Sequence, residues 1–197
     1  SAVFMQVPAG NGTYTVTDNS SNQGNAYWTS ASVSNASAWV ADTYSLSFTA
    51  ADSWEVRNSS GSLVGSGSYS SGQSIAFAGV SIGFEGTPVA GDQFVVAQSG
   101  FQSVFKTVQD FLTTLDVDTG SPAGRAAFQN RLNSNLTNID QSLQHFGNIQ
   151  SQVGARLATI ERQQSSNADM SLDLSQSISV IRDLDYASAI SRLEQQL

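Results

Sequence analysis

The chain of 197 residues is long enough for one large domain or two modest ones, and 40% of its residues are hydrophobic while only 12% are charged. Its net charge of −8 argues against a nucleic-acid binder, which needs clustered cations, and disfavours binding to anionic membrane surfaces. The absence of Cys and the single His145 argue against disulfides, thiol catalysis and multi-histidine metal sites, and no apolar run is long enough to cross a membrane.

The composition of the chain changes near residue 100. Twelve of the 16 glycines and all three tryptophans lie in the first hundred residues, whereas the rest has few glycines and long stretches without proline. Such a change is typical of a domain boundary. We therefore expect a two-domain α+β protein, with a β-rich, sandwich-like outer domain over residues 1–98 and a helical rod domain over residues 99–197.

The first half has the alternation of short antiparallel strands. Tyr44, Leu46 and Phe48 alternate with Ser and Thr, and Trp54 and Val56 continue the same pattern. Clusters of Gly, Asn and Ser separate the apolar runs and supply turns. Further strands are expected around residues 14–17, 75–77, 80–84 and 94–96, the second and third joined as a hairpin at Gly79. Strands at this spacing indicate a β-sandwich or a small barrel.

The second half has the periodicity of helices. An apolar stripe from Phe101 to Leu115 predicts a short helix over about 101–115. Ser121 followed by Pro122 is a strong start signal, so a long helix is expected from about residue 122. Steps of three and four residues place these apolar side chains on one stripe of that helix: Leu132, Leu136, Ile139, Leu143, Val153, Leu157, Ile160, Ile178 and Ile181.

This stripe requires a partner. A helix continuous over about residues 122–184 would be on the order of 90 Å long at 1.5 Å per residue. One helix of four turns and a domain of about 100 residues cannot cover that length, and an uncovered apolar seam is unstable in water. We therefore expect the stripe to be a packing and assembly site for a helix from another chain or from another part of the protein.

The end of the chain carries a family resemblance. Residues 179–190 (SVIRDLDYASAI) and 152–157 (QVGARL) resemble segments of the C-terminal helix of bacterial flagellins and flagellar hook-associated proteins. In the first half, residues 75–82 (IAFAGVSI) and 86–94 (GTPVAGDQF) resemble the β domain of the hook–filament junction branch of that family, hook-associated protein 3. The residues 103–105 (SVF) fit the same branch.

The resemblance implies an extracellular, secreted structural subunit of the bacterial flagellum that joins the hook to the filament and thereby serves motility. It also implies a homo-oligomeric ring, with hook-associated protein 1, flagellin and an export chaperone as partners. Family members begin with long helices that pair with the C-terminal helix. The chain is therefore expected to be a core fragment without either terminal helical segment, whose missing partner helix is the protein's own N-terminal segment.

Two other functions remain open: flagellin itself, and a carbohydrate-binding or adhesin module that would use Trp28 or Trp39. Neither an enzyme nor a cofactor is expected, because no nucleophile and base can be paired. The loop from Asp116 to Gly120 lacks the later ligands of an EF-hand, so we expect a solvated loop and no metal site. His145 is expected to face solvent.

Overall fold

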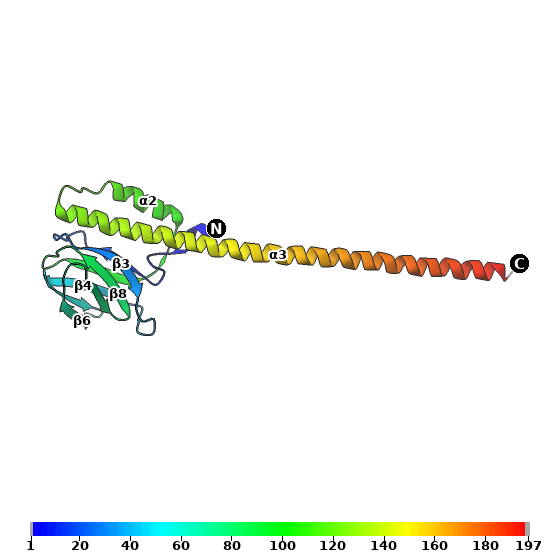
Figure 1. Cartoon of the computed structure of the whole chain (residues 1–197), viewed down its shortest axis with the longest axis horizontal. Helices are drawn as coiled ribbons and strands as arrows, with labels where there is room; N and C mark the ends of the chain where they lie inside the picture. Colours follow the sequence, from blue (N-terminus) through cyan, green and yellow to red (C-terminus); the bar gives the residue numbers. More distant parts are fainter. Residues whose placement is uncertain (1, 196–197) are drawn as a thin grey trace. The chain divides into compact units, whose positions relative to one another are not determined.

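The computed structural model describes residues 2–195, and the chain divides between Gly147 and Asn148 into two compact units, here called unit 1 and unit 2. Helix α3 begins in unit 1 and continues through unit 2 (Figure 1). The helices are α1 (Ala2–Met5), α2 (Val104–Leu115) and α3 (Pro122–Glu194). The strands are β1 (Val7–Pro8), β2 (Tyr14–Asp18), β3 (Tyr27–Val33), β4 (Thr43–Ala50), β5 (Ser53–Arg57), β6 (Leu63–Ser68), β7 (Ser74–Phe77), β8 (Val80–Glu85), β9 (Gln93–Gln98) and β10 (Phe101–Gln102).

Two antiparallel sheets in unit 1 pack face to face. One has the order β2-β9-β4-β5-β6 and the other the order β3-β8-β7, while β1 and β10 form a separate pair. The ring of Phe84, from the three-stranded sheet, lies 4.8 Å from that of Phe94 and 5.8 Å from that of Phe48 in the five-stranded sheet. All three rings are buried, as alternation along each strand requires. The predicted α+β class, with a β-rich sandwich followed by a long helix, is confirmed.

Most of the predicted strands are present, with some corrections. The predicted hairpin is β7–β8: Phe77 pairs with Val80 around the two-residue turn of Ala78 and Gly79, both at positive φ (44° and 81°). Trp54 and Val56 do not continue β4, however. They belong to β5, which turns back beside β4, because residues 51–52 form a tight turn. The sequence pattern does not indicate β1, β3, β6 or β10, and β6 carries few apolar residues to reveal it.

The long helix begins at Pro122, as predicted, and extends past residue 184 to Glu194. The short helix begins later than the apolar pattern indicated. Phe101 lies in β10, where the backbone pairs with β1, and α2 starts after Ser103, whose Oγ accepts a hydrogen bond from the backbone N–H of Lys106. Side-chain periodicity did not separate these segments, because an apolar residue fits either structure.

The change from strands to helices falls near residue 100, where the composition changes, but the compact units divide at residue 147. The reason is that the first part of α3 is bonded to the strands through its polar side chains, so that residues 122–147 belong with the sandwich. In unit 1, α2 runs beside this part of α3 (Figure 1), and the two helices are joined by the hydrogen bond from Asn135 to Thr114.

Candidate functional site

The first turns of α3 are fastened to the edge strand β3 by asparagines. The backbone N–H of Trp28 donates to Oδ1 of Asn130 (2.9 Å), and the backbone oxygen of Trp28 accepts from Nδ2 of Asn133 (2.7 Å). Trp28 lies where a bulge shifts the β3–β8 register. Asparagine amides can donate and accept at once, so the pair satisfies both backbone groups of one residue on a sheet edge.

The same side of α3 also contacts β2 and the loop before it. Ser134 Oγ donates to the backbone oxygen of Val16 (3.3 Å), and Asn138 Oδ1 accepts from the backbone N–H of Gly10 (2.7 Å). The helix therefore docks on the sandwich through hydrogen bonds rather than through its apolar stripe. Sequence reasoning missed this role, although the repeated Asn between residues 130 and 138, a poor helix former, was an available signal.

Helix α2 turns its polar side inward. Thr107 and Thr114 are buried, and Thr114 Oγ1 accepts from Nδ2 of Asn135 on α3 (2.8 Å). The apolar side consequently faces solvent, with exposed fractions of 54–69% for Phe105, Val108, Leu112 and Leu115. A surface helix of a monomeric protein normally has the opposite arrangement.

The apolar side of α3 in unit 1 is also uncovered. Leu136 is 48% and Leu143 is 64% exposed, while Leu132 and Ile139 are half-buried. We call the exposed side chains of the two helices the helical apolar surface, consisting of Phe105, Val108, Leu112, Leu115, Leu136 and Leu143.

The short helix α1 lies next to this surface. The ring of Phe4 is 6.5 Å from that of Phe105 on α2 and 5.5 Å from that of Phe146 on α3. Phe4 thus brings the start of the described chain onto both helices, at the end of the surface where α2 begins.

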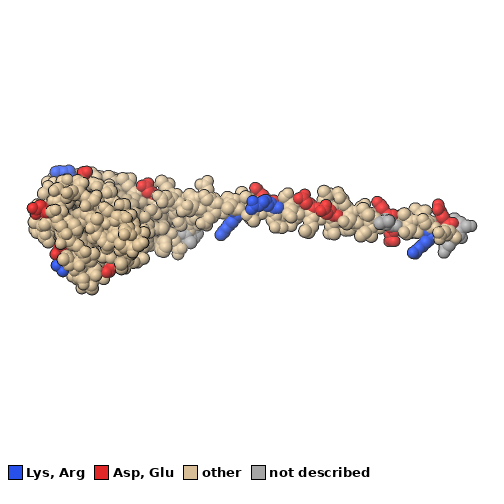
Figure 2. Space-filling model, turned by 60° about the horizontal axis from the view of Figure 1, so that its bottom comes forward, with Lys and Arg blue, Asp and Glu red and all other residues tan. Residues whose placement is uncertain are grey.

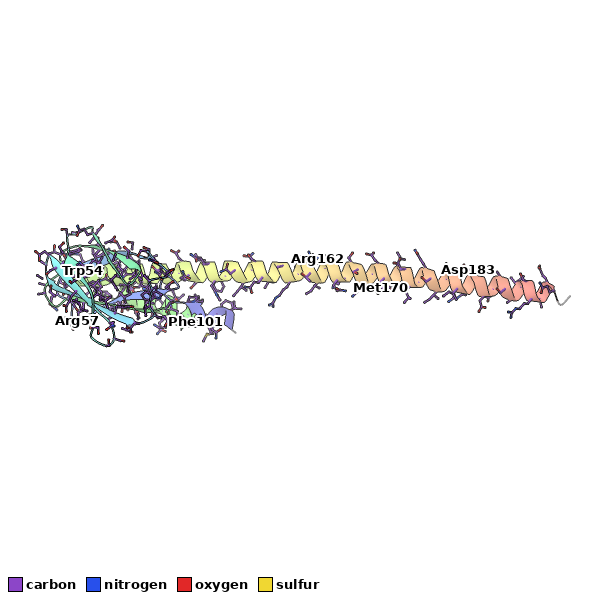
Figure 3. All side chains as sticks on the ribbon, turned by 90° about the horizontal axis from the view of Figure 1, so that it is seen from below. Trp54, Arg57, Phe101, Arg162, Met170 and Asp183 are labelled. Carbon is purple, nitrogen blue, oxygen red and sulfur yellow. The ribbon has the colours of Figure 1, made fainter. Side chains whose placement is uncertain are left out.

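In unit 2, α3 has no buried side. Every side chain described between residues 150 and 195 is exposed, and Figure 3 shows side chains projecting around the helix near Arg162, Met170 and Asp183. The predicted stripe residues in this unit have exposed fractions of 51–67%: Val153, Leu157, Ile160, Ile178 and Ile181. Charged side chains of both signs occur along this part of α3 (Figure 2). Exposed apolar residues in this number are unusual for a monomer and typical of an interaction surface.

The Gly-Asp-Gln-Phe sequence of the family resemblance has a structural role in the sandwich. Gly91 adopts a φ of +98°, Asp92 is 3% exposed, and Phe94 is fully buried. The Asp92 carboxylate accepts hydrogen bonds from the backbone N–H groups of Gln23 (2.8 Å), Gly24 (3.1 Å) and Val89 (2.9 Å). These bonds hold the loop before β3 against the loop before β9, and they explain the acidic residue at this position.

The tryptophans do not form an open stacking platform. Trp28 is 4% exposed, and Trp39 is packed between Tyr14 and Tyr44, with ring centroids 5.6 and 5.7 Å away. Trp54 lies over the glycines of β6, and its indole N–H donates to the oxygen of Ser68 (3.1 Å). This arrangement gives no support to sugar stacking on exposed tryptophans.

Titratable groups are few and give no catalytic cluster among the described residues. Burial raises the pKa of the Tyr14 phenol to about 12, and its hydroxyl donates to the backbone oxygen of Ser32. We expected His145 to face solvent, but in the structure it does not. The side chain of His145 is half-buried and its Nε2 atom is covered. The reason is that residue 145 lies on the same side of α3 as Asn138 and Ser142, which is the side that is covered in unit 1.

No group of three or more His, Cys, Asp or Glu in the described part of the chain is placed to hold a metal ion. In the loop after α2, Asp118 Oδ1 instead accepts from the backbone N–H of Gly120 (2.8 Å). None of the helices within residues 2–195 combines the length and the apolar character of a membrane span.

Comparison with known proteins gave a family and several similar structures. A family model described as flagellar hook-associated protein 1, D2-like domain, matches residues 17–98. The chain is similar to FlgL from Xanthomonas campestris, with 34% identity over 91% of this chain and 58% of that one, at a TM-score of 0.82. No match was found among curated protein sequences.

Two structures from Legionella pneumophila are also similar. The flagellar junction protein FlgL has 32% identity over 89% of this chain and 57% of that one, at a TM-score of 0.81. Flagellar hook-associated protein 3 has 31% identity over 92% of this chain and 59% of that one, at a TM-score of 0.84. The chain thus spans a little more than half the length of these relatives.

Proposed function

This chain belongs to the flagellar hook-associated protein family, and from that premise we propose that it is part of a structural adaptor joining the hook of a bacterial flagellum to its filament. The adaptor is secreted and works outside the cell, as part of the motility apparatus. Its role is mechanical, without catalysis, cofactor or bound metal. The similarity to junction proteins over about nine-tenths of the chain favours this function over that of flagellin.

The proposal depends most on the uncovered apolar side chains of α2 and α3. The helical apolar surface in unit 1, and the stripe from Val153 to Ile181 in unit 2, leave large aliphatic and aromatic groups in water. Burying one such side chain contributes about 1.5–3 kcal/mol, so a partner helix lying along them would gain a large stabilisation. An assembling subunit needs such a surface, whereas a self-contained monomer does not.

In the proposed mechanism the stripe closes a helical bundle with the protein's own N-terminal segment. Within that bundle, Leu132, Leu136, Ile139 and Leu143 pack in the first part, and Val153, Leu157, Ile160, Ile178 and Ile181 farther along. The other helix faces contact neighbouring copies in a ring. Residues 1–98 form the outer domain and residues 99–197 the rod domain of each subunit, and the first part of the rod domain, up to residue 147, packs in one compact unit with the outer domain.

The proposed partners are further copies of the chain, hook-associated protein 1 on the hook side and flagellin on the filament side. An export chaperone covers the apolar side chains before secretion, because exposed apolar helices aggregate in water. The docking of α3 on the strands through asparagines favours this arrangement, since it leaves the apolar side of the helix available for the bundle.

The experiment compares two substitutions in the full-length protein. Leu157→Asp places a carboxylate in the stripe, and burying an unpaired charge costs at least several kcal/mol, as much as a typical domain's stability margin. Thr159→Asp introduces the same charge two residues on, about 200° around the helix. Both variants are expressed in cells lacking the natural copy, at matched secretion, and are scored by swimming motility and by filaments counted in electron micrographs.

We expect Leu157→Asp cells to release flagellin without attached filaments, while Thr159→Asp cells retain most of theirs. Leu157→Met, which preserves the apolar character, should restore filaments. Normal filaments with Leu157→Asp would overturn the proposal. Equal loss with both aspartates would show that the stripe has no special role in joining.

A further inference from the structure

The apolar stripe of unit 2 contains polar residues that keep its spacing. Along the continuous helix α3, the stripe advances by alternating steps of four and three residues, which is the repeat of a coiled coil. The positions in this repeat are Val153, Leu157, Ile160, Gln164, Asn167, Ser171, Leu174, Ile178 and Ile181. We call Gln164, Asn167 and Ser171 the polar segment of the stripe, and all three side chains are exposed.

The polar segment does not separate two independent stripes. Leu174 follows Ile160 by fourteen residues, which is two full repeats, so the apolar positions after the polar segment are in phase with those before it. Two unrelated stripes would have no reason to share this phase. A repeat sustained across the polar segment indicates that one partner helix lies along the whole stripe from Val153 to Ile181.

Polar side chains in such a packed seam need hydrogen-bond partners, because burying an unpaired amide or hydroxyl group is unfavourable. Asn167 lies in the middle of the polar segment. Its Oδ1 accepts a hydrogen bond from Nε2 of Gln163 (3.0 Å), whereas its Nδ2 group has no acceptor among the described residues. A helix that packs on this part of α3 must therefore supply an acceptor for the Asn167 amide.

We propose that the polar segment fixes the register of the partner helix, and that this helix carries amide or hydroxyl side chains opposite it. The inference rests on the proposed function, in which the partner is a helix of the protein's own N-terminal segment. The similar junction proteins have additional chain for such a helix, since the match covers 58% and 59% of their length.

The register is fixed because only one alignment pairs the polar groups. Sliding the partner helix by one seven-residue repeat moves it by about 10 Å. The seam then remains closed elsewhere, but the polar segment of α3 meets apolar side chains and the polar groups of the partner meet leucine and isoleucine. A single polar position in a coiled-coil seam specifies register in this way, at some cost in stability.

The test measures amide hydrogen exchange over residues 153–181 of the full-length protein by mass spectrometry, which reports local opening of this part of the bundle. Asn167→Leu removes the amide with little change in size, and Asn167→Gln keeps it. Ser166→Leu is the matched control, because it introduces the same apolar side chain at an exposed position about 100° around the helix from Asn167. Leu157→Ala tests whether the stripe is packed at all.

Asn167→Leu should accelerate exchange about tenfold, because it leaves a polar group of the partner buried without a hydrogen bond. Asn167→Gln should have a smaller effect, and Ser166→Leu should change the rate by no more than about twofold. If the partner presents apolar side chains here, Asn167→Leu gains apolar contact and exchange becomes slower. Slower or unchanged exchange in Asn167→Leu would overturn the proposal.

Leu157→Ala distinguishes this inference from the proposed function. Faster exchange with Leu157→Ala but not with Asn167→Leu would show that the stripe is packed and that the polar segment does not set its register. Unchanged exchange with Leu157→Ala would show that the stripe is not packed, which would overturn both proposals.

Discussion

Replacing Asp92 by alanine should weaken the sandwich of unit 1 strongly, although the side chain is small and lies in a loop. The substitution removes one carboxylate and leaves the backbone N–H groups of Gln23, Gly24 and Val89 without their acceptor. Hydrogen bonds to charged groups contribute about 1.5–3 kcal/mol each. Gln23 and Val89 are exposed, so water can replace part of what is lost. We therefore expect a loss of about 3–4 kcal/mol, a large share of a typical stability of about 5–15 kcal/mol.

This change can be measured by urea unfolding with tryptophan fluorescence as the readout. The signal reports on the sandwich, because all three tryptophans lie there. Asp92→Asn keeps the shape and one acceptor oxygen, and should lose about 2 kcal/mol. Asp52→Ala, an exposed carboxylate in the turn between β4 and β5, is the matched control and should change stability by less than about 0.5 kcal/mol.

Asp92→Ala should destabilise the protein most, Asp92→Asn less and Asp52→Ala least. If Asp92→Ala costs less than about 1 kcal/mol with an unchanged urea dependence, the three backbone bonds do not hold the loops together and the reasoning fails.

Three other changes test the structure. Asn130→Ala should cost about 1–3 kcal/mol in the same urea assay, because it leaves the buried N–H of Trp28 unpaired, and no loss would contradict the docking of α3. Gly79→Ala should cost about 2 kcal/mol or more, since φ is +81° and the new Cβ would meet the oxygen of Asn35; a neutral result would refute the hairpin geometry. The contribution of Tyr14 to the free energy of unfolding should be complete below about pH 10, the pKa of an unfolded tyrosine. It should be lost as the pH rises from there through the folded pKa of about 12. Tyr14→Phe should abolish that part of the alkaline loss, as measured by unfolding at a series of pH values.

Local patterns in the sequence predicted most secondary structure. Alternation at Tyr44, Leu46 and Phe48 placed a strand with one buried face, and Ser121 with Pro122 placed the start of α3 at the correct residue. These signals are local, because strand pleating and helix capping depend on residues within a few positions of each other. Where local patterns are ambiguous, prediction failed: Phe101 fits a strand or a helix, and strand pairing with β1 decided the matter.

Periodicity by itself identified an apolar stripe on α3 that needs a partner, but only the tertiary structure decided which sides of the helices meet the sandwich. Asn130 bonds to Trp28 across 102 positions of sequence, and Thr114 turns inward to meet Asn135, leaving the apolar sides uncovered. A helical pattern shows which side chains lie on the same side of the helix, but it does not show which side contacts a neighbouring element. That choice depends on the unpaired backbone groups at the edges of β2 and β3, which favour the asparagines and serine of α3 over its leucines.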